Sequence, residues 1–340
     1  MSFVVRIKPD NLVFFIEPGE NILDAALRQG FEFSYGCQQG SCGTCATKLL
    51  EGKVSYPENE PIGLEEDEAA ANFILLCSAV AESDLVLQHA GVTTPWQSVV
   101  RKIPYRVANM HMLSSTITQL ILEPMDEHAI HFQAGQYIEL YTPDGEHRPY
   151  SIANAPVAGQ HIIELHVRHV VENPFSTLLL DNIAKTQQVT LEGPFGHCIY
   201  RKGITYPLIF LAGGTGFSHS KALIEQAIQH APDVPMHLFW GAKTPPDLYM
   251  TDLLQRWQQE LPAFQYTPTI SRSDGTYDWQ GHTTSLPQLV TEFYPDLCGK
   301  LVYASGPPAL VLDALQHFKQ HGLKPEFLCS DVFDYIEAPK

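Results

Sequence analysis

Apolar and polar positions alternate in three different ways along the chain. In the first stretch, residues 3–8 and 12–16 are short apolar or alternating runs on either side of Pro9-Asp10-Asn11, which predicts a β-hairpin. Asn21 can cap a helix that stops at Gly30, and the apolar stripe of this helix is Ile22, Leu23, Ala26 and Leu27. A strand hairpin followed by a helix is therefore expected ahead of a glycine-rich stretch.

Between residues 103 and 200 the pattern is one of short strands separated by turns. The expected strands are residues 105–112, 117–122, 136–141, 162–168 and 187–191. A helix interrupts them, with Asn173 as its cap, Pro174 at its first position and residues 175–181 as its body. Regular short strands with turns such as Pro143-Asp144-Gly145 predict an antiparallel barrel or sandwich.

After Pro207, short apolar runs alternate with helical patterns. The expected strands are residues 208–212, 236–240, 264–270 and 301–304, and the expected helices are residues 219–229, 251–260, 285–292 and 308–320. Strands that alternate with helices indicate a doubly wound parallel sheet. The fold class is therefore multidomain, α+β and α/β, and glycine and proline near residues 90–104 place a linker between the first part and the rest.

Four cysteines in the first part carry the clearest chemistry. Residues 35–45 read Tyr-Gly-Cys-Gln-Gln-Gly-Ser-Cys-Gly-Thr-Cys, and the fourth cysteine follows after thirty-one further residues. Glycines let such a loop curl and turn its N–H groups toward sulfur atoms. The spacing is that of a plant-type [2Fe-2S] site, which predicts as its ligands Cys37, Cys42, Cys45 and Cys77.

Two other uses of these cysteines are open on the spacing alone. Structural zinc also takes four cysteines, but its ligands come as two short pairs, and Cys77 has no near partner. Disulfides require an oxidising compartment, which nothing else in the chain indicates. An iron–sulfur cluster is therefore the favoured interpretation.

The net charge of the chain limits the kinds of macromolecule that it is expected to bind. Among 340 residues, Lys+Arg total 21 and Asp+Glu 38, a net charge of −17, which argues against nucleic acid and anionic membranes. Residues 1–92 hold five basic and fourteen acidic side chains. Their densest acidic run, residues 65–68, is typical of a solvated helix start and is also a candidate docking surface for a basic protein.

The compartment is expected to be the cytoplasm. The first residues lack the features of a signal peptide, and no apolar run reaches the roughly 20 residues that span a bilayer. Cys198, Cys298 and Cys329 show no pairing pattern, which fits a reducing environment.

A second candidate site is Arg148-Pro149-Tyr150-Ser151. The arginine can hold a phosphate, the tyrosine can stack on a flat ring, and the serine can offer a hydroxyl to a ring nitrogen. A strand end with a buried tyrosine is the alternative. Farther on, Arg168 at a strand end and Ser176 in a helix start could hold a pyrophosphate, as FAD requires.

Two small-residue loops form a third candidate site. The loop after the first parallel strand consists of Gly213, Gly214, Thr215, Gly216 and Phe217. Ser305, Gly306 and Pro307 follow a later strand and lie at the same carboxyl edge, where doubly wound sheets bind ligands. Each loop is also compatible with a plain strand-to-helix turn, and together they could flank a nicotinamide ring.

These three blocks, in this order, resemble the ferredoxin-NADP+ reductase superfamily, in the branch with an N-terminal [2Fe-2S] ferredoxin domain. Members include reductase components of bacterial oxygenases and CDP-6-deoxy-glucoseen reductases. The resemblance covers nearly the whole chain and implies a β-grasp ferredoxin domain (residues 1–92), a linker (93–102), an FAD-binding antiparallel β-barrel (103–203) and an NAD(P)-binding doubly wound domain (204–340).

The resemblance also implies roles for particular residues. Arg148 would contact the flavin phosphates, Tyr150 would pack on the flavin ring and Ser151 would lie near its N5 atom. Val167, Arg168 and Ser176 match the elements that meet the pyrophosphate of FAD, and residues 213–217 match the nicotinamide dinucleotide loop. The residues assigned to catalysis are Ser151, Ser305 and Phe333, of which Phe333 resembles an aromatic residue beside the flavin and is equally compatible with a buried strand position.

Three positions depart from the family pattern. Asn173 replaces a glycine, Ser218-His219 stands where a proline dipeptide is usual, and Ser305 stands where many members carry a cysteine. His219 is interpreted as a local packing variant. The serine at position 305 excludes a thiol role in hydride transfer.

The expected function is an NAD(P)H-dependent reductase that passes electrons through FAD and a [2Fe-2S] cluster to a partner protein, foremost an oxygenase component. The alternatives are a reductase for a CDP-sugar dehydrase, an NAD(P)H:flavin reductase suggested by residues 208–250, and a non-catalytic redox sensor. NADH is favoured as donor, although Ser271-Arg272 stands where NADPH-specific relatives bind a 2′-phosphate and Lys243 is nearby. The protein is expected to be a monomer.

Overall fold

The computed structural model describes residues 2–9, 12–31, 33–57, 60–89, 92, 100–125, 129–169, 174–196, 198–200, 205–271, 276–324 and 327–332. The chain divides into two compact units, residues 1–97 with 201–204, and residues 98–200 with 205–340. Within the described residues, no helix is both long and apolar enough to cross a membrane.

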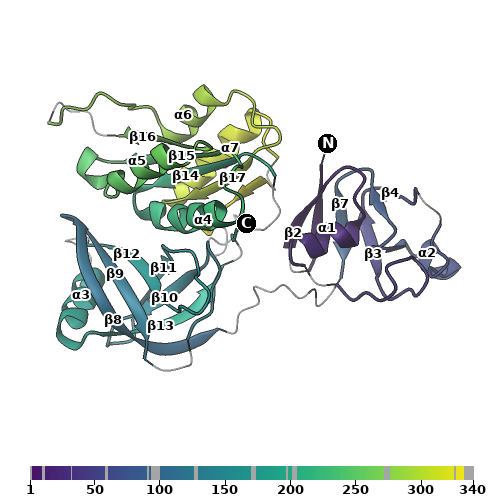
Figure 1. The fold of residues 1–340 in the computed structure, drawn as a ribbon, viewed down its shortest axis with the longest axis horizontal. Coiled ribbons are helices and arrows are strands. Elements are labelled where there is room, and N and C mark those ends of the chain that lie inside the picture. Colours follow the sequence, from purple (N-terminus) through teal and green to yellow (C-terminus); the bar gives the residue numbers. More distant parts are fainter. Residues whose placement is uncertain are drawn as a thin grey trace. The chain divides into compact units, whose positions relative to one another are not determined.

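The first unit is a β-grasp domain in which one helix packs on a mixed sheet (Figure 1). The sheet has the order β2-β1-β7-β3-β5, with bounds β1 Phe3–Lys8, β2 Leu12–Ile16, β3 Ala46–Glu51, β5 Phe73–Leu75 and β7 Leu85–Gln88. A second, two-stranded sheet joins β4 (Val54–Ser55) to β6 (Val80–Ala81). The predicted hairpin is confirmed, since β1 and β2 pair antiparallel.

Helix α1 (Ile22–Arg28) confirms the predicted cap. The Asn21 side chain accepts a hydrogen bond from the Asp24 N–H, which satisfies one of the free donors at the helix start. The helix buries Ile22, Leu23, Ala25 and Ala26 against a core that includes Phe14 and Phe31. The short helix α2 (Glu66–Ala70) has no buried residue, and Glu65 and Glu68 form a capping box at its start, as expected of a solvated acidic helix start.

The second unit begins with a barrel-like antiparallel sheet of order β11-β10-β13-β8-β9-β12. Its strands are β8 Arg101–Ser114, β9 Ile117–Pro124, β10 Tyr137–Tyr141, β11 His147–Ser151, β12 Ile163–Arg168 and β13 Gln188–Phe195. Helix α3 spans Pro174–Thr186, five residues longer than predicted at its C-terminal end. Strand β8 starts at Arg101 and continues through Pro104, which lies opposite Thr190.

Strand β11 is the element of the barrel sheet that the sequence pattern misses, and the pattern also gives no prediction for β3 to β7 of the first unit. Three of the five residues of β11 are exposed and Pro149 lies at its centre, so the apolar alternation of a strand is absent. The position of β11 at the end of the sheet order explains this composition, because an edge strand tolerates proline and polar side chains.

The remainder of the second unit is a parallel sheet of order β16-β15-β14-β17-β18, with helices on both faces (Figure 1). The strands are β14 Leu208–Gly213, β15 Met236–Ala242, β16 Phe264–Ile270, β17 Leu301–Ser305 and β18 Leu328–Cys329. The helices are α4 Phe217–His230, α5 Thr251–Glu260, α6 Leu286–Phe293 and α7 Pro308–Gln320. All four predicted parallel strands and all four predicted helices are confirmed, and β18 is an addition that its two-residue length hides from pattern analysis.

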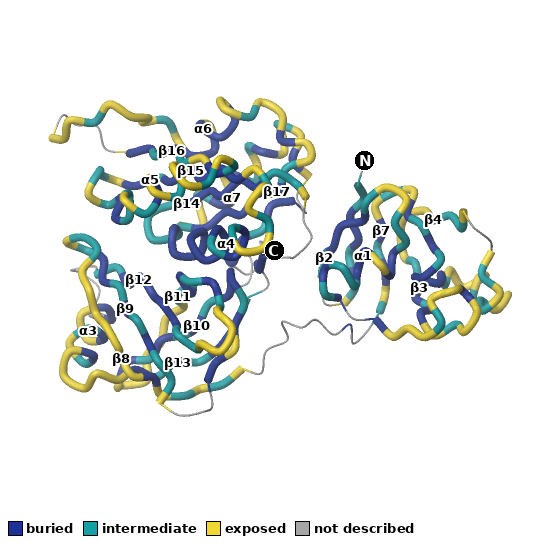
Figure 2. The backbone as a smooth tube through the Cα atoms, in the orientation of Figure 1, coloured by how far each residue is buried: buried dark blue, intermediate teal, exposed yellow. Residues whose placement is uncertain are grey.

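Strand β14 forms the centre of this sheet and is buried on both faces (Figure 2). The chain adds β15 and β16 on one side of β14 and then crosses to add β17 and β18 on the other. The carboxyl ends of β14 and β17 therefore form a topological switch point, where a crevice opens beyond the sheet.

The separate core of the first unit leads to a stability prediction. Phe14 is fully buried, and its ring centroid lies 5.3 Å from that of Phe31. We expect Phe14→Ala to destabilise this unit by about 3–5 kcal/mol, because it leaves a cavity in a close-packed core. Thermal unfolding followed by the visible absorbance of the iron–sulfur cluster would measure the loss.

Leu50→Ala is the matched control, because the Leu50 side chain on β3 is 45% exposed. The control variant should unfold near the wild-type temperature. An equal shift in the unfolding of the second unit with Phe14→Ala would contradict the assignment of separate cores.

Candidate active site

The four predicted cluster ligands lie together in the first unit. Cys45 and Cys77 are buried with their Sγ atoms 3.3 Å apart, whereas Cys37 is half-buried and Cys42 is exposed. A disulfide requires a separation of about 2.05 Å, so the Cys45 and Cys77 thiols are not bonded to each other. Two of the four sulfurs therefore lie on the buried side of the site, and two lie nearer the surface.

Backbone and hydroxyl donors point at the outer sulfurs. The Gln39 and Ser41 N–H groups each lie 3.4 Å from Cys37 Sγ, the Ser41 hydroxyl lies 3.3 Å from it, and the Cys37 N–H lies 3.4 Å from Cys42 Sγ. The Ser41 hydroxyl and these N–H groups lower the pKa of Cys37 to about 6. Gly40 and Gly43 have φ of 69° and 72°, the left-handed backbone that lets the loop curl. The donor set fits a cluster held by thiolates, whose charge such hydrogen bonds stabilise.

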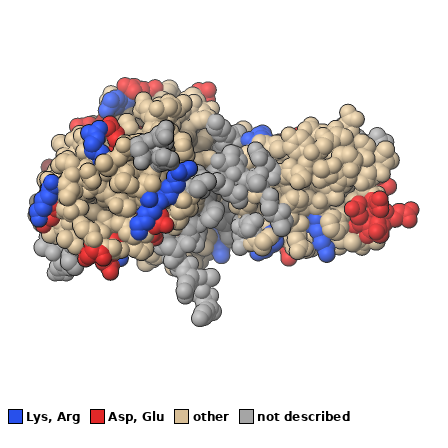
Figure 3. Space-filling view, turned by 90° about the horizontal axis from the view of Figure 1, so that it is seen from below, with Lys and Arg blue, Asp and Glu red and all other residues tan. Residues whose placement is uncertain are grey.

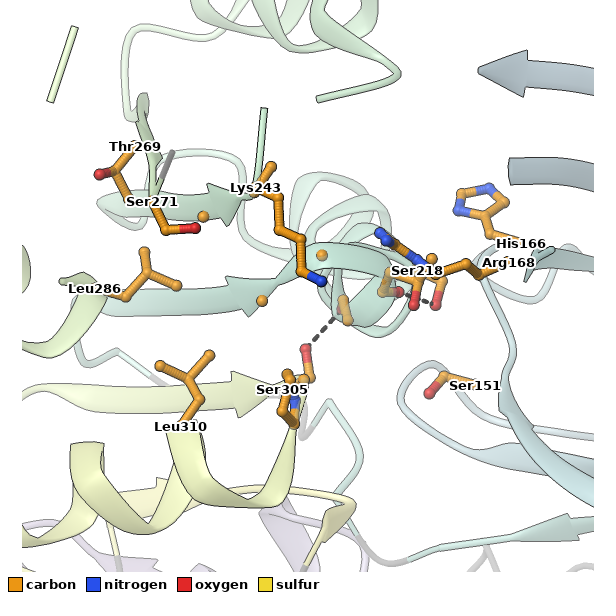
Figure 4. Close-up of a pocket in the computed structure, with 18 of the residues that line it drawn as sticks. Ser151, His166, Arg168, Ser218, Lys243, Thr269, Ser271, Leu286, Ser305 and Leu310 are labelled. Atoms are coloured by element: carbon orange, nitrogen blue, oxygen red, sulfur yellow. Dashed lines mark hydrogen bonds between the residues drawn. The ribbon is translucent and has the colours of Figure 1, made fainter. Parts of the chain in front are cut away.

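A cavity of about 950 Å³ opens in the second unit at the switch point of the parallel sheet. It extends from the end of the barrel sheet to the carboxyl edges of β14, β15, β16 and β17, so both cofactor-related blocks of the sequence border one space. Figure 4 shows Ser151 on one side of this space and Ser305 on the other. The sequence-predicted residues that line it are Arg148, Tyr150, Ser151, Arg168, Gly213, Gly214, Thr215, Gly216, Ser305, Gly306 and Pro307.

On the barrel side, β11 carries three of these residues. Tyr150 is mostly buried, and burial raises its pKa to about 12, so its phenol stays neutral. The Ser151 hydroxyl donates to Asp331 Oδ2 at 3.0 Å. Arg148 is half exposed, with its guanidinium 5.2 Å from the Phe175 ring centroid. A flat aromatic surface, a hydroxyl and a cation thus line the same wall, which fits a flavin nucleotide.

On the parallel-sheet side, two loops meet almost backbone to backbone. A Cβ atom on Gly216 would lie 2.5 Å from the Ser305 carbonyl oxygen, so only glycine fits at this position. The Ser305 hydroxyl donates to the Gly216 carbonyl at 2.6 Å and joins the two loops. The 3-10 turn Gly214–Gly216 lines the cavity and leads directly into α4, so the start of a helix borders the cavity. This arrangement fits a nicotinamide dinucleotide.

Three predicted residues lie off the cavity. Val167 is fully buried in the barrel core, and Ser176 is buried in α3. Phe217 is fully buried, with its ring stacked on Trp240 at 4.1 Å between centroids. The side chains of Val167 and Phe217 therefore belong to the core, and cofactor contacts at these positions would have to come from the backbone. Phe333, Asn173 and Arg272 lie outside the described residues.

Sequence patterns did not identify several of the residues at the cavity, and two of these are polar residues beside the flavin side. Asp331, which follows β18, lines the cavity and accepts from Ser151. His166 on β12 also borders the cavity, although its side chain is almost fully buried. Neither residue belongs to a local motif, and 180 positions separate Ser151 from Asp331, so only the folded chain reveals the contact.

Comparisons with known proteins agree with this organisation. Residues 5–82 match the 2Fe-2S iron–sulfur cluster binding domain, residues 104–200 match the oxidoreductase FAD-binding domain, and residues 210–316 match the oxidoreductase NAD-binding domain. The first match supports an iron–sulfur cluster over structural zinc at the four cysteines.

Relatives that match along the whole length include a reductase. The chain is 34% identical over 333 residues to CDP-6-deoxy-L-threo-D-glycero-4-hexulose-3-dehydrase reductase of Yersinia pestis, covering 98% of this chain and 99% of the relative. It is 31% identical over 327 residues to the phenol hydroxylase P5 protein of Acinetobacter pittii, covering 95% and 92%.

A similar solved structure is that of the Amycolatopsis cytochrome P450 reductase GcoB, with a TM-score of 0.64, 26% identity, and coverage of 97% of this chain and 98% of that one. The domain order, the site geometry and the whole-length relatives agree. The chain therefore belongs to the ferredoxin-NADP+ reductase superfamily, in the branch of oxidoreductases with an N-terminal [2Fe-2S] ferredoxin domain.

Proposed function

We propose that the protein takes electrons from NADH or NADPH at the cavity of the second unit and delivers them from the cluster of the first unit to an oxygenase component. The observation that carries this proposal is the single cavity bordered by both the β11 residues and the β14 and β17 loops. Bound FAD would supply the chemistry that couples a two-electron donor to a one-electron acceptor.

The roles of the lining residues follow from their chemistry. Tyr150 would pack against the flavin ring. Ser151 would lie at the edge of the ring, with its hydroxyl donating a hydrogen bond to Asp331. Arg148 and Arg168 would neutralise the phosphates. Residues 213–216 would hold the nicotinamide dinucleotide through backbone N–H groups, while Ser305 would keep that loop close to β17. The neutral, mostly buried Tyr150 would exclude water from the reacting face.

The second candidate acceptor is a CDP-hexulose dehydrase. The observation that favours it is the 34% identity to the Yersinia pestis reductase along nearly the full length of both chains. Reduction of each purified acceptor by the holoprotein would separate the two, because only the physiological partner should show saturable kinetics.

The cluster is expected to be the exit for electrons. Cys42→Ala removes one of four thiolates, so the cluster should not assemble. Reduction of cytochrome c, a one-electron acceptor, should fall at least about tenfold, while flavin reduction by NADH should persist, because the second unit has its own core.

Cys298→Ala is the matched control, since Cys298 is an exposed thiol outside the cluster loop. Full delivery of electrons to the physiological acceptor by Cys42→Ala would instead support free flavin as the product.

We propose that the acceptor docks on the acidic side of the first unit. The side chains of Glu65, Glu66 and Asp67 are exposed, and Ile62 beside them is 89% exposed. Figure 3 shows acidic side chains gathered on one face of this unit. The preceding loop contacts the cluster loop, because the Gly63 N–H donates to the Gly40 carbonyl at 2.9 Å. A basic partner with an apolar contact would fit this surface.

Neutralising Glu66→Gln with Asp67→Asn tests the docking surface, since these two residues lie outside the Glu65–Glu68 capping box. We expect the KM for the acceptor to rise about two- to fivefold at low salt and the difference to shrink at high salt, because screening weakens exposed charge pairs. The control Glu51→Gln with Glu82→Gln makes the same charge change on exposed residues elsewhere in the unit. Equal effects of both pairs would refute a local docking surface.

We propose that the cavity accepts NADPH as well as NADH. Lys243 and Ser271 line it just beyond the ends of β15 and β16, where doubly wound sheets place the adenosine ribose. A cation and a hydroxyl suit a 2′-phosphate better than a ribose diol.

Lys243→Ala should lower kcat/KM for NADPH about two- to fivefold relative to NADH, a modest change because Lys243 is exposed. Steady-state kinetics with both donors would measure the ratio. Lys300→Ala, a lysine outside the cavity, serves as the control. If the ratio of kcat/KM for NADPH to that for NADH did not change, Lys243 would not be a ligand of the 2′-phosphate.

A further inference from the structure

Helix α4 packs on strand β12 through side chains whose spacings match. The two-residue period of a strand places Glu164, His166 and Arg168 on one face of β12. The four-residue period of a helix places Phe217, Lys221 and Glu225 on one face of α4. These two rows of side chains face each other where the barrel meets the parallel-sheet domain.

Lys221 is the centre of the contact. Its side chain is 5% exposed, and its ammonium group has three partners: the Ala153 carbonyl at 2.9 Å, Glu164 Oε2 at 3.0 Å and Glu225 Oε1 at 2.8 Å. The first two contacts are hydrogen bonds to the flavin domain, and the third is an ion pair to a residue four positions along the same helix. Glu225 in turn accepts from the Ala155 N–H at 3.0 Å. One lysine of the nicotinamide domain is thus inserted among groups of the flavin domain.

Glu164 is equally well satisfied. Its Oε1 atom receives Gln119 Nε2 at 2.7 Å and His166 Nε2 at 2.9 Å. Burial raises the pKa of this carboxyl, but the His166 hydrogen bond and the Lys221 charge outweigh burial and hold it at about 2. The pKa of Lys221 is lowered by burial and raised more strongly by Glu164 and Glu225, so the net direction is upward. The pair therefore stays ionised throughout the neutral range.

His166 continues the network toward the cavity. Because Nε2 donates to Glu164, Nδ1 is left to accept from the Tyr249 hydroxyl at 3.0 Å. Burial lowers the pKa of His166, which keeps this neutral tautomer. The hydrogen bonds from Tyr249 through His166, and the one from Gln119, thus converge on Glu164 and connect the two domains.

Both interacting elements end at the cavity. Arg168 terminates β12 and lines the cavity, while Gly214–Gly216 precedes α4. A Cβ atom on Gly214 would lie 3.2 Å from Arg168 Nη2, so the two termini nearly touch. Trp240, stacked on Phe217, donates from Nε1 to the Gly214 carbonyl at 2.9 Å. A shift of α4 along β12 would therefore move the glycine loop relative to Arg168.

We propose that Lys221 and Glu164 are positioning residues that set the register of α4 on β12, and with it the spacing between the flavin and nicotinamide sides of the cavity. The inference rests on the proposed function. Stability alone does not explain a buried ion pair, because replacing such a pair by apolar residues of similar volume often leaves the free energy of unfolding unchanged or raises it. Apolar contact is non-directional, whereas the two hydrogen bonds from the Lys221 ammonium to the flavin domain and the one from the Ala155 N–H to Glu225 specify a single register.

The test removes both charges together. Lys221→Met alone leaves Glu164 buried and unpaired and should lower the unfolding temperature. The double variant Lys221→Met/Glu164→Gln leaves no charge at position 164. Glu225 loses its cation, but its side chain is 26% exposed and keeps the hydrogen bond from the Ala155 N–H, so the double variant should unfold near the wild-type temperature. We expect flavin reduction by saturating NADH to slow about 10- to 100-fold in the double variant, with little change in KM, because the two binding surfaces are intact but misplaced.

A second readout needs no cofactor. In the flavin-free protein, hydrogen–deuterium exchange of residues 213–225 should be faster in the double variant than in wild type, while the rest of the parallel sheet is unchanged. Lys319→Met is the matched control, since Lys319 is exposed on α7 of the same domain, and it should alter neither readout.

Wild-type rates and wild-type exchange in the double variant would overturn the positioning role. A double variant that unfolds as early as Lys221→Met would also overturn it, since the pair would then serve stability. Failure of the wild-type holoprotein to oxidise either nicotinamide would refute the proposed function instead, and the exchange measurement would still test the register.

Discussion

The reductase half of this protein depends on the close approach of two backbone segments at the carboxyl edge of the parallel sheet. Gly216 lies so near the Ser305 carbonyl that a single Cβ atom would force β14 and β17 apart. The Ser305 hydroxyl stabilises the same contact, because it donates a hydrogen bond to the Gly216 carbonyl. Because the crossover of the chain occurs between these strands, their contact lies at the switch point of the sheet, and residues from both loops line the cavity there.

Charge serves two different purposes in the two units. On the first unit, exposed carboxylates gather near the cluster loop, where water screens them and they can attract a partner over a distance of several ångströms. In the second unit, Lys221 and Glu164 are enclosed by protein and each hydrogen-bonding group has a partner. Buried charges of this kind form hydrogen bonds of fixed geometry and exert little long-range attraction. Such bonds suit a contact that fixes how two domains pack around one cavity.

Local patterns predicted most of the elements, and they failed at identifiable places. The parallel strands and their helices follow from apolar runs long enough to show their period, such as Leu208–Gly213. Strand β11 was not predicted, because an edge strand tolerates Pro149 and exposed polar residues and so lacks the apolar alternation of a strand. Phe217 was grouped with its glycine neighbours, yet its ring packs on Trp240, since sequence adjacency does not reveal which way a side chain points.

The sequence by itself determined the chemistry that is local in the chain. Three cysteines and their glycines in one short loop predict a cluster site, because one curled segment can supply three ligands. The glycine turn before α4 is likewise local in the chain, and it predicts a phosphate-binding loop. The tertiary structure alone decided which distant residues meet. Asp331 reaches Ser151, and Lys221 reaches Glu164, across separations for which no periodicity exists, because such contacts depend on how whole domains pack.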